Sequence, residues 1–177
     1  MEIFTLLVII FLILLIPTAY AGLIGAPYAP TFTPAIEQAF DYIKLGQKDT
    51  LIDLGAGDGR VLLAAARRGA ASLGYELSPI MWAVVLLRTL GNKKIKIKLR
   101  NFYKQSLPNA TVIFAFLMPK HMGKVRHFLS RQSLSHSKYL LIYAFPLPPD
   151  TKPLHIVRAA KCAPLYIYDL KMLTKPV

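Results

Sequence analysis

The stretch Asp53-Leu54-Gly55-Ala56-Gly57-Asp58-Gly59-Arg60 decides the fold of this chain. It follows the apolar, strand-like residues 50–52 and precedes the apolar, helix-like residues 61–66. Three glycines at alternate positions permit positive φ and let the backbone approach a ligand closely. The helix that follows presents free N–H groups at its start. The stretch therefore predicts a strand, a glycine turn and a helix that together bind a nucleotide-like ligand.

The spacing of this turn argues against two common nucleotide sites. Arg60 stands where a G-x-G-x-x-G dinucleotide fingerprint has its third glycine. No Gly-Lys-Ser/Thr follows, as a phosphate-cradling loop requires. NAD and ATP are therefore disfavoured as ligands.

A second motif, which ends in an acidic residue, follows the glycine turn, and the two motifs together resemble those of a known family. Residues 53–59 resemble the first motif of class I S-adenosylmethionine-dependent methyltransferases, and Gly74-Tyr75-Glu76 resembles their second. A turn, a helix and a short strand fit between Asp53 and Glu76, so both acids are expected at the carboxyl edge of adjacent parallel strands, where open α/β sheets bind ligands. The resemblance implies that Glu76 binds the ribose of S-adenosyl-L-methionine and that the turn lies along its amino-acid part.

The resemblance also supplies the remaining cofactor contacts. The family usually has Asp after its third strand, where this chain has Asn101, whose amide can still hydrogen-bond to adenine. The residues expected to bind the cofactor are Asp53, Gly55, Ala56, Gly57, Gly59, Glu76, Leu77, Asn101 and Phe102.

Two short motifs narrow the resemblance further. Pro27-Tyr28-Ala29-Pro30-Thr31 before the turn, and Phe116-Leu117-Met118-Pro119 after the fourth expected strand, are similar to the small membrane-anchored lysine methyltransferases. Mitochondrial members of that family modify the adenine nucleotide translocase and the c subunit of ATP synthase. Tyr28 and Phe116 are therefore candidates for positioning the substrate, with Phe114 as a further aromatic candidate. The chain lacks Asn/Asp-Pro-Pro-aromatic at the fourth-strand exit, which disfavours methylation of exocyclic base amines.

The first residues of the chain form an unbroken apolar stretch. Residues 3–16 carry no polar face, and the stretch continues through Pro17 to Ile24, which is long enough to cross a bilayer. No Lys or Arg precedes it, as a signal peptide requires, although Ala19-Tyr20-Ala21 resembles a cleavage site. We therefore predict a transmembrane anchor over residues 1–26 and a single methyltransferase domain over 27–177, with export as the alternative.

The rest of the chain is strongly basic. Residues 27–177 carry 22 Lys and Arg against 8 Asp and Glu, because Glu2 is the one charged residue before them. This excess of Lys and Arg predicts a domain on the cytoplasmic side of the membrane. Six bases occur over residues 93–104, and Ile95, Ile97 and Leu99 alternate with them, which is typical of a strand with one basic face. That face is either solvated or docked on anionic headgroups. A nucleic-acid groove is disfavoured because the interleaved residues are not aromatic.

The expected secondary structure alternates strands with helices. An early helix near 34–45 is followed by strands over 50–54, 71–76, 94–100, 110–117 and 138–144, with helices over 58–68, 79–90 and 119–132 between them. This order predicts a Rossmann-like α/β fold with a mostly parallel sheet. The last strands, 154–160 and 164–170, are joined by three residues and should form an antiparallel hairpin. Cys162 and the four histidines lack metal-ligand spacing, so the site is expected to be metal-free.

The leading hypothesis is a membrane-anchored enzyme that transfers a methyl group to a lysine amine of a membrane protein. One alternative is a methyltransferase for a lipid or a quinone-like small molecule. The other is a module that binds the cofactor without catalysis. Four side chains are given structural roles: Asp58 as a helix N-cap, Arg60 on a helix surface, and His121 and His127 facing solvent.

Overall fold

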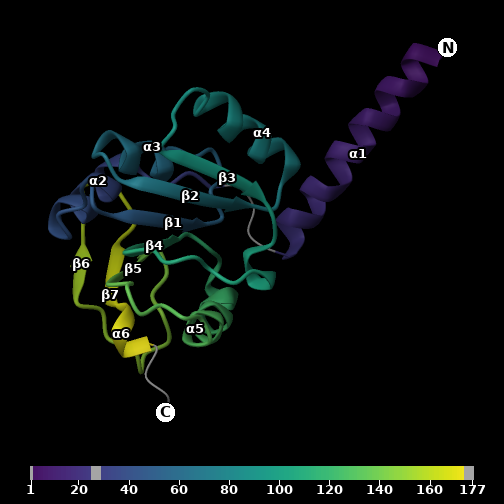
Figure 1. Cartoon of the computed structure of the whole chain (residues 1–177). Helices are drawn as coiled ribbons and strands as arrows, with labels where there is room; N and C mark the ends of the chain where they lie inside the picture. Colours follow the sequence, from purple (N-terminus) through teal and green to yellow (C-terminus); the bar gives the residue numbers. More distant parts are fainter. Residues whose placement is uncertain (1, 25–28, 174–177) are drawn as a thin grey trace.

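The computed structural model describes residues 2–24 and 29–173. A seven-stranded sheet of order β3-β2-β1-β4-β5-β7-β6 forms the centre of the domain (Figure 1). Strands β1 to β5 run parallel to one another, and β7 runs antiparallel to both β5 and β6. The predicted Rossmann-like sheet with a C-terminal antiparallel hairpin is confirmed. The strands are β1 (Thr50–Leu54), β2 (Ala71–Glu76), β3 (Ile95–Leu99), β4 (Val112–Ala115), β5 (Tyr139–Tyr143), β6 (His155–Val157) and β7 (Leu165–Asp169).

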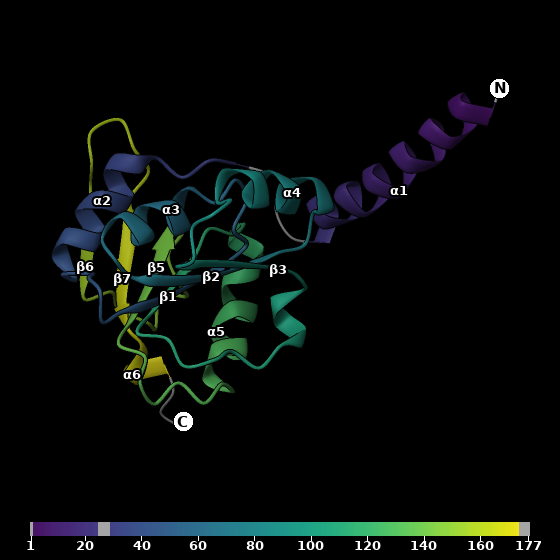
Figure 2. The same ribbon diagram turned by 45° about the horizontal axis from the view of Figure 1, so that its top comes forward.

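Helices cover both faces of the sheet, so that the domain has three layers. Figure 2 shows helices above the sheet and below it. The upper layer contains α2 (Thr33–Tyr42), α3 (Arg60–Arg67) and α4 (Pro79–Arg88), and the lower layer contains α5 (Met122–Ser130) and α6 (Leu170–Leu173). Two short 3₁₀ helices, η1 (Phe102–Lys104) and η2 (Pro119–His121), follow β3 and β4.

The central strand β4 shows why both layers are needed. Its side chains alternate between two cores. Val112 and Phe114 point towards the upper helices, and Ile113 and Ala115 point towards the lower ones. All four are buried. A parallel strand covered on both sides carries such a continuous apolar run.

The observed elements are mostly shorter than the predicted ones. The helix expected over 58–68 begins at Arg60, because Gly59 has φ +78°, which a right-handed helix cannot accommodate. The strand expected over 110–117 ends at Ala115, and the helix expected over 119–132 divides into η2 and α5. The sequence pattern located these elements correctly but overextended their ends.

The N-terminal helix α1 (Glu2–Ile24) extends away from the domain, with its lower end beside α4 (Figure 1). Over the part of the chain that the structure describes, no helix qualifies as long and apolar enough to cross a membrane. The transmembrane helix predicted within residues 1–26 is therefore not shown, although a helix does form there. The predicted domain boundary after residue 26 falls in 25–28, outside the described residues.

Candidate functional site

The glycine turn after β1 has the backbone that its sequence predicts. Gly55, Gly57 and Gly59 all adopt positive φ, at 110°, 54° and 78°. The amides of Gly55 and Ala56 donate to the carbonyl oxygen of Tyr75 at 3.0 and 2.9 Å, which ties the turn to strand β2. The turn therefore lies at the carboxyl edge of the sheet, between β1 and the N-terminus of α3.

Glu76 ends β2 and holds the same turn from the other side. Its carboxylate accepts hydrogen bonds from the amides of Gly57, Leu77 and Ser78, each at 2.8 Å. Burial raises the pKa of Glu76, and these backbone donors partly offset the rise. A carboxylate has about four acceptor sites, so roughly one remains for a ligand. Glu76 is thus a structural link between two turns as well as a candidate ribose ligand.

Asp53 is the most unusual polar group of the site. Its side chain is 1% exposed, and its Oδ1 has no hydrogen-bond partner among the described residues. Burial raises the pKa of Asp53 well above its ordinary value, and the nearby carboxylates of Glu76 and Asp58 raise it further. A buried carboxyl without a partner is costly. It calls for a hydrogen-bond donor or a cation supplied by a ligand.

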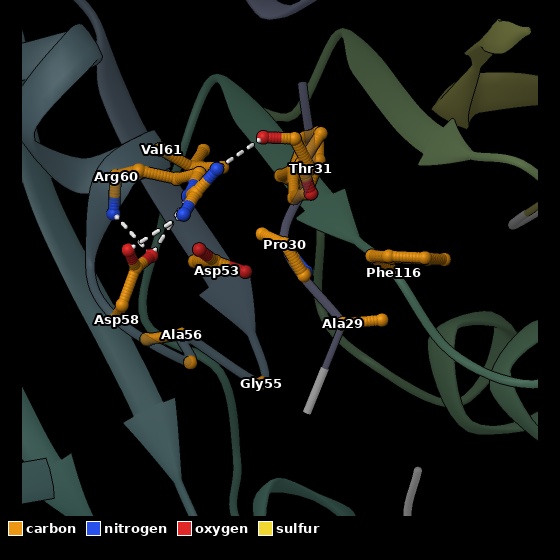
Figure 3. Close-up of a pocket in the computed structure, with 12 residues that line it drawn as sticks. Ala29, Pro30, Thr31, Asp53, Gly55, Ala56, Asp58, Arg60, Val61 and Phe116 are labelled. Atoms are coloured by element: carbon orange, nitrogen blue, oxygen red, sulfur yellow. Dashed lines mark hydrogen bonds and ion pairs between the residues drawn. The ribbon is translucent and has the colours of Figure 1, made fainter. Parts of the chain in front are cut away.

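A small recess lies in front of this carboxyl (Figure 3). Its volume is about 30 Å³, which is room for about two water-sized groups. The recess can therefore enclose a group the size of an ammonium, while the rest of a larger ligand extends beyond it along the edge of the sheet. The lining residues are Ala29, Pro30, Thr31, Asp53, Gly55, Ala56, Gly57, Asp58, Arg60, Val61, Phe114 and Phe116.

An ion-pair cluster beside the recess corrects two of the predictions. Asp58 is not the N-cap of α3, which is Gly59. Its carboxylate accepts from the amide of Arg60 at 3.3 Å, from Arg60 Nε and Nη2, both at 2.9 Å, and from Arg88 Nη1. Burial works against the charge, yet these arginines lower the pKa of Asp58 to about 2. Arg60 is not a free surface residue either, because its Nη1 donates to the carbonyl oxygen of Thr31 at 2.9 Å.

Arg60, Arg88 and Thr31 are site residues that the sequence reasoning missed. Arg60 connects the glycine turn to the segment 29–31 that lines the recess (Figure 3). The available signal was an arginine at the position where a dinucleotide-binding turn has glycine. Its bidentate fork can hold a carboxylate and a carbonyl at once.

The structure describes two of the three aromatic residues that were candidates for positioning the substrate. Phe116 is half-buried, lines the recess and packs edge-on against Tyr143, with ring centroids 4.9 Å apart. Phe114 also lines the recess but is fully buried in the core. Tyr28 lies outside the described residues. The positioning roles of Tyr28 and Phe116 remain predictions.

Five predicted cofactor residues stand at the same edge of the sheet without lining the recess. Among the described residues, these are Gly59, Glu76, Leu77, Asn101 and Phe102. The Asn101 Oδ1 accepts from the amide of Tyr103 at 3.0 Å and so caps η1. The ring of Phe102 is buried against those of Tyr103 and Phe128. Their roles in binding also remain predictions.

Two further expectations concern histidines and metals. His127 is exposed as predicted, but His121 is not: it is partly buried, and its Nε2 has no partner among the described residues. The part of the chain that the structure describes contains no group of three His, Cys, Asp or Glu side chains that could hold a metal ion.

The sheet order, the glycine turn after β1 and the acid that ends β2 define a class I methyltransferase. Residues 53–155 match the family model of the ANTKMT methyltransferase domain, and the chain belongs to this family. A Caenorhabditis elegans enzyme, named as the lysine N-methyltransferase of the ATP synthase c subunit, is 33% identical over 133 residues. The human enzyme of the same name is 28% identical over 135 residues. These matches cover 70% and 73% of the chain.

The chain spans 69% of the C. elegans relative but only 56% of the human one. A solved structure shares the fold more completely. The RNA methyltransferase from Salinibacter ruber, in complex with S-adenosyl-L-homocysteine, superposes with a TM-score of 0.73 at 24% identity. The match covers 80% of this chain and 94% of that one.

Proposed function

We propose that this protein is an S-adenosylmethionine-dependent methyltransferase. The observation that carries the proposal is the buried carboxyl of Asp53 at the recess beside the glycine turn, whose Oδ1 has no hydrogen-bond partner among the residues that the structure describes. When bound, S-adenosylmethionine supplies an activated methyl group on a positively charged sulfur. Its cationic amino group is the kind of partner that the Asp53 carboxyl lacks, and the size of the recess suits such a group.

The residues of the chain would then divide the work of binding. Asp53 holds a cation in the recess, and the glycine turn lets the backbone lie close to the ligand. Glu76 uses its remaining acceptor capacity for a hydroxyl, and the Asn101 amide lies at the end of the next strand in the sheet. Since the methyl group is already activated, catalysis requires mainly that two reactants are held in line.

We infer that the methyl acceptor is a lysine amine of a membrane protein. Relatives are named as lysine methyltransferases of the ATP synthase c subunit, which supports a protein substrate. A lysine must lose its proton before it attacks, and a low-dielectric aromatic surface favours the neutral amine. Phe116 supplies such a surface beside the recess. Methylation of a lipid or a quinone-like molecule, and cofactor binding without catalysis, are the competing functions.

Attachment to a membrane through α1 is the second part of the proposal. Helix α1 exposes a run of large apolar side chains, among them Ile3, Phe4 and Phe11. Exposed apolar surface of that extent marks an interaction site. The excess of Lys and Arg after residue 26 favours a domain on the cytoplasmic side, where the cofactor is made.

One experiment separates the three functions. Membranes carrying the full chain are incubated with S-adenosylmethionine labelled on its methyl group, and the label is then followed into protein and lipid fractions. We expect label on lysine of a membrane protein, and no label with Asp53→Ala at the same cofactor concentration. Label in the lipid fraction would support the small-molecule alternative. Cofactor binding without any transfer would support the non-catalytic one. Carbonate extraction of the same membranes tests the attachment.

A further inference from the structure

We infer that the outer face of α4 and the turn that follows it form a docking surface for an anionic phospholipid bilayer. This inference rests on the proposed attachment through α1 and goes beyond it, because it assigns a second, peripheral contact that orients the domain. We define this docking surface by the exposed side chains Ile80, Leu86, Leu87, Leu90, Lys93 and Lys94.

Helix α4 is apolar on the side that faces solvent as well as on the side that faces the sheet. Residues 79–87 contain no polar side chain. Val85 is the residue that packs inward, where it lies against the glycine turn at Gly59. A helix on the surface of a soluble domain normally carries polar residues on its outer face. The composition of α4 therefore points to a non-aqueous partner on that face.

The exposed apolar residues share one side of α4. Ile80, Ala83 and Leu87 are spaced three and four residues apart, which places them on one helical face. Leu87 is 75% exposed, and Leu90, just beyond the helix, is 84% exposed. Single exposed leucines need no explanation, but a continuous stripe of this kind marks an interaction surface.

The charge beside this stripe is positive. No Asp or Glu occurs between Glu76 and Asp150, a stretch that includes α4 and the turn after it. That turn carries Lys93 and Lys94, both exposed, just beyond Leu90. Bases beside an apolar stripe match an anionic headgroup layer over acyl chains.

Continuity with α1 selects a bilayer over other partners. The lower end of α1 contacts α4, and both views of the molecule place that end beside α4 (Figures 1 and 2). A bilayer that holds α1 therefore lies next to the docking surface without any further movement of the chain. The exposed aliphatic side chains of α4 suit lipid, whereas a single-stranded nucleic acid requires exposed aromatic rings for base stacking.

The single tryptophan of the chain reports on this contact. Trp82 lies on α4 and is partly exposed. The full chain is mixed with vesicles of phosphatidylcholine alone or with phosphatidylserine, each containing lipid brominated near the headgroup, and Trp82 fluorescence is recorded. We expect quenching in the anionic vesicles that falls at least twofold in two double variants, Leu87→Asn with Leu90→Asn and Lys93→Gln with Lys94→Gln. The matched control, Leu154→Asn with Lys152→Gln on the far side of the sheet, should quench like the unaltered protein.

The outcomes separate this inference from the proposed attachment. Failure of the full chain to sediment with any vesicle would overturn both. Sedimentation without quenching of Trp82 would overturn the docking surface and leave the attachment through α1 standing. Equal quenching in neutral vesicles, unaffected by the lysine variants, would contradict the anionic partner. Self-association in lipid-free solution that Leu87→Asn with Leu90→Asn abolishes would make the face an interface between two copies and also overturn the inference.

Discussion

Arg60 Nη1 donates a hydrogen bond to the carbonyl oxygen of Thr31 at 2.9 Å, and this bond joins the glycine turn to the segment that leads in from α1. The same guanidinium is held by Asp58 through two further bonds. Because residues 29–31 line the recess in front of Asp53, Arg60 sets one wall of the site from the opposite side. Arg60 is therefore a positioning residue for the recess.

Replacing Arg60 by lysine should loosen that wall. Lysine keeps the charge but cannot hold a carboxylate and a carbonyl with one planar fork. A loss of about 1.5 kcal/mol of hydrogen bonding would weaken cofactor binding about tenfold. Calorimetric titration measures it. Arg67→Lys, on the exposed side of the same helix, is the control and should bind normally. Equal cofactor affinities of the two variants would show that Arg60 has no role in the site.

The Asp58 cluster should make stability depend on pH at the acidic end. The pKa of Asp58 is about 2 in the folded protein against an ordinary 3.8. Because the folded value is the lower one, the stabilisation is complete above about pH 4 and is lost as the pH falls through about 2. Asp58→Asn should thus cost stability at pH 6, with a gap to the unaltered protein that closes towards pH 2. Urea unfolding across this range tests it.

Asp150→Asn is the matched control for that series, since it breaks the exposed pair of Arg126 with Asp150. Exposed pairs contribute about 0–1 kcal/mol. A pH profile of Asp150→Asn that equals that of Asp58→Asn would show that the buried cluster has no special role.

Binding of the cofactor should release a proton from Asp53. Burial keeps this carboxyl neutral well above its usual range, and a cation in the recess would favour its ionised form. Affinity should therefore rise with pH below the raised pKa of Asp53. Calorimetry in two buffers of different ionisation enthalpy should give different apparent heats, and Asp53→Asn should abolish the difference. Buffer-independent heats for the unaltered protein would contradict this assignment.

Glu76→Ala should lower both stability and cofactor affinity. The substitution leaves three backbone amides at the two turns without their acceptor, and an unsatisfied buried donor costs about 1–3 kcal/mol. Thermal unfolding and calorimetric titration measure the two effects. Glu37→Ala, which removes a surface partner of Arg67 and Arg68, should change stability less and binding not at all. A folded Glu76→Ala protein with unchanged affinity would refute the proposed place of the ribose.

A pair of glycines separates backbone strain from crowding in the turn. Gly59 and Gly91 share the same φ of +78°, so alanine is strained equally at both. A Cβ at Gly59 would lie 2.9 Å from Val85 Cγ1, whereas one at Gly91 meets nothing within 4 Å. Gly91→Ala should cost about 1–2 kcal/mol, and Gly59→Ala about 1–3 kcal/mol more. Equal unfolding free energies of the two variants would show that Val85 on α4 moves aside from a Cβ at Gly59 without cost.

The sequence by itself determined the class of fold and the edge of the sheet that carries the site. Alternating strand and helix patterns predict the parallel sheet because each pattern depends on periodicities that extend over neighbouring residues. The three positive φ angles of the glycine turn follow from residue type in the same local way. So does the position of Glu76 at the end of β2, since the length of the connection limits where the next strand can end.

What the side chains do at that edge depends on how distant elements pack together. Asp58 stands where the sequence predicts a helix N-cap, yet Arg88, thirty residues away, and Arg60 hold its carboxylate. Most acceptor sites of the Glu76 carboxylate are occupied by backbone amides of the protein, although the residue was predicted as a ligand of the ribose. The partner of a charged side chain is set by which elements pack together, and long-range packing leaves no periodic trace in the sequence. The burial of Asp53, and with it the recess that calls for a cation, arises in the same way.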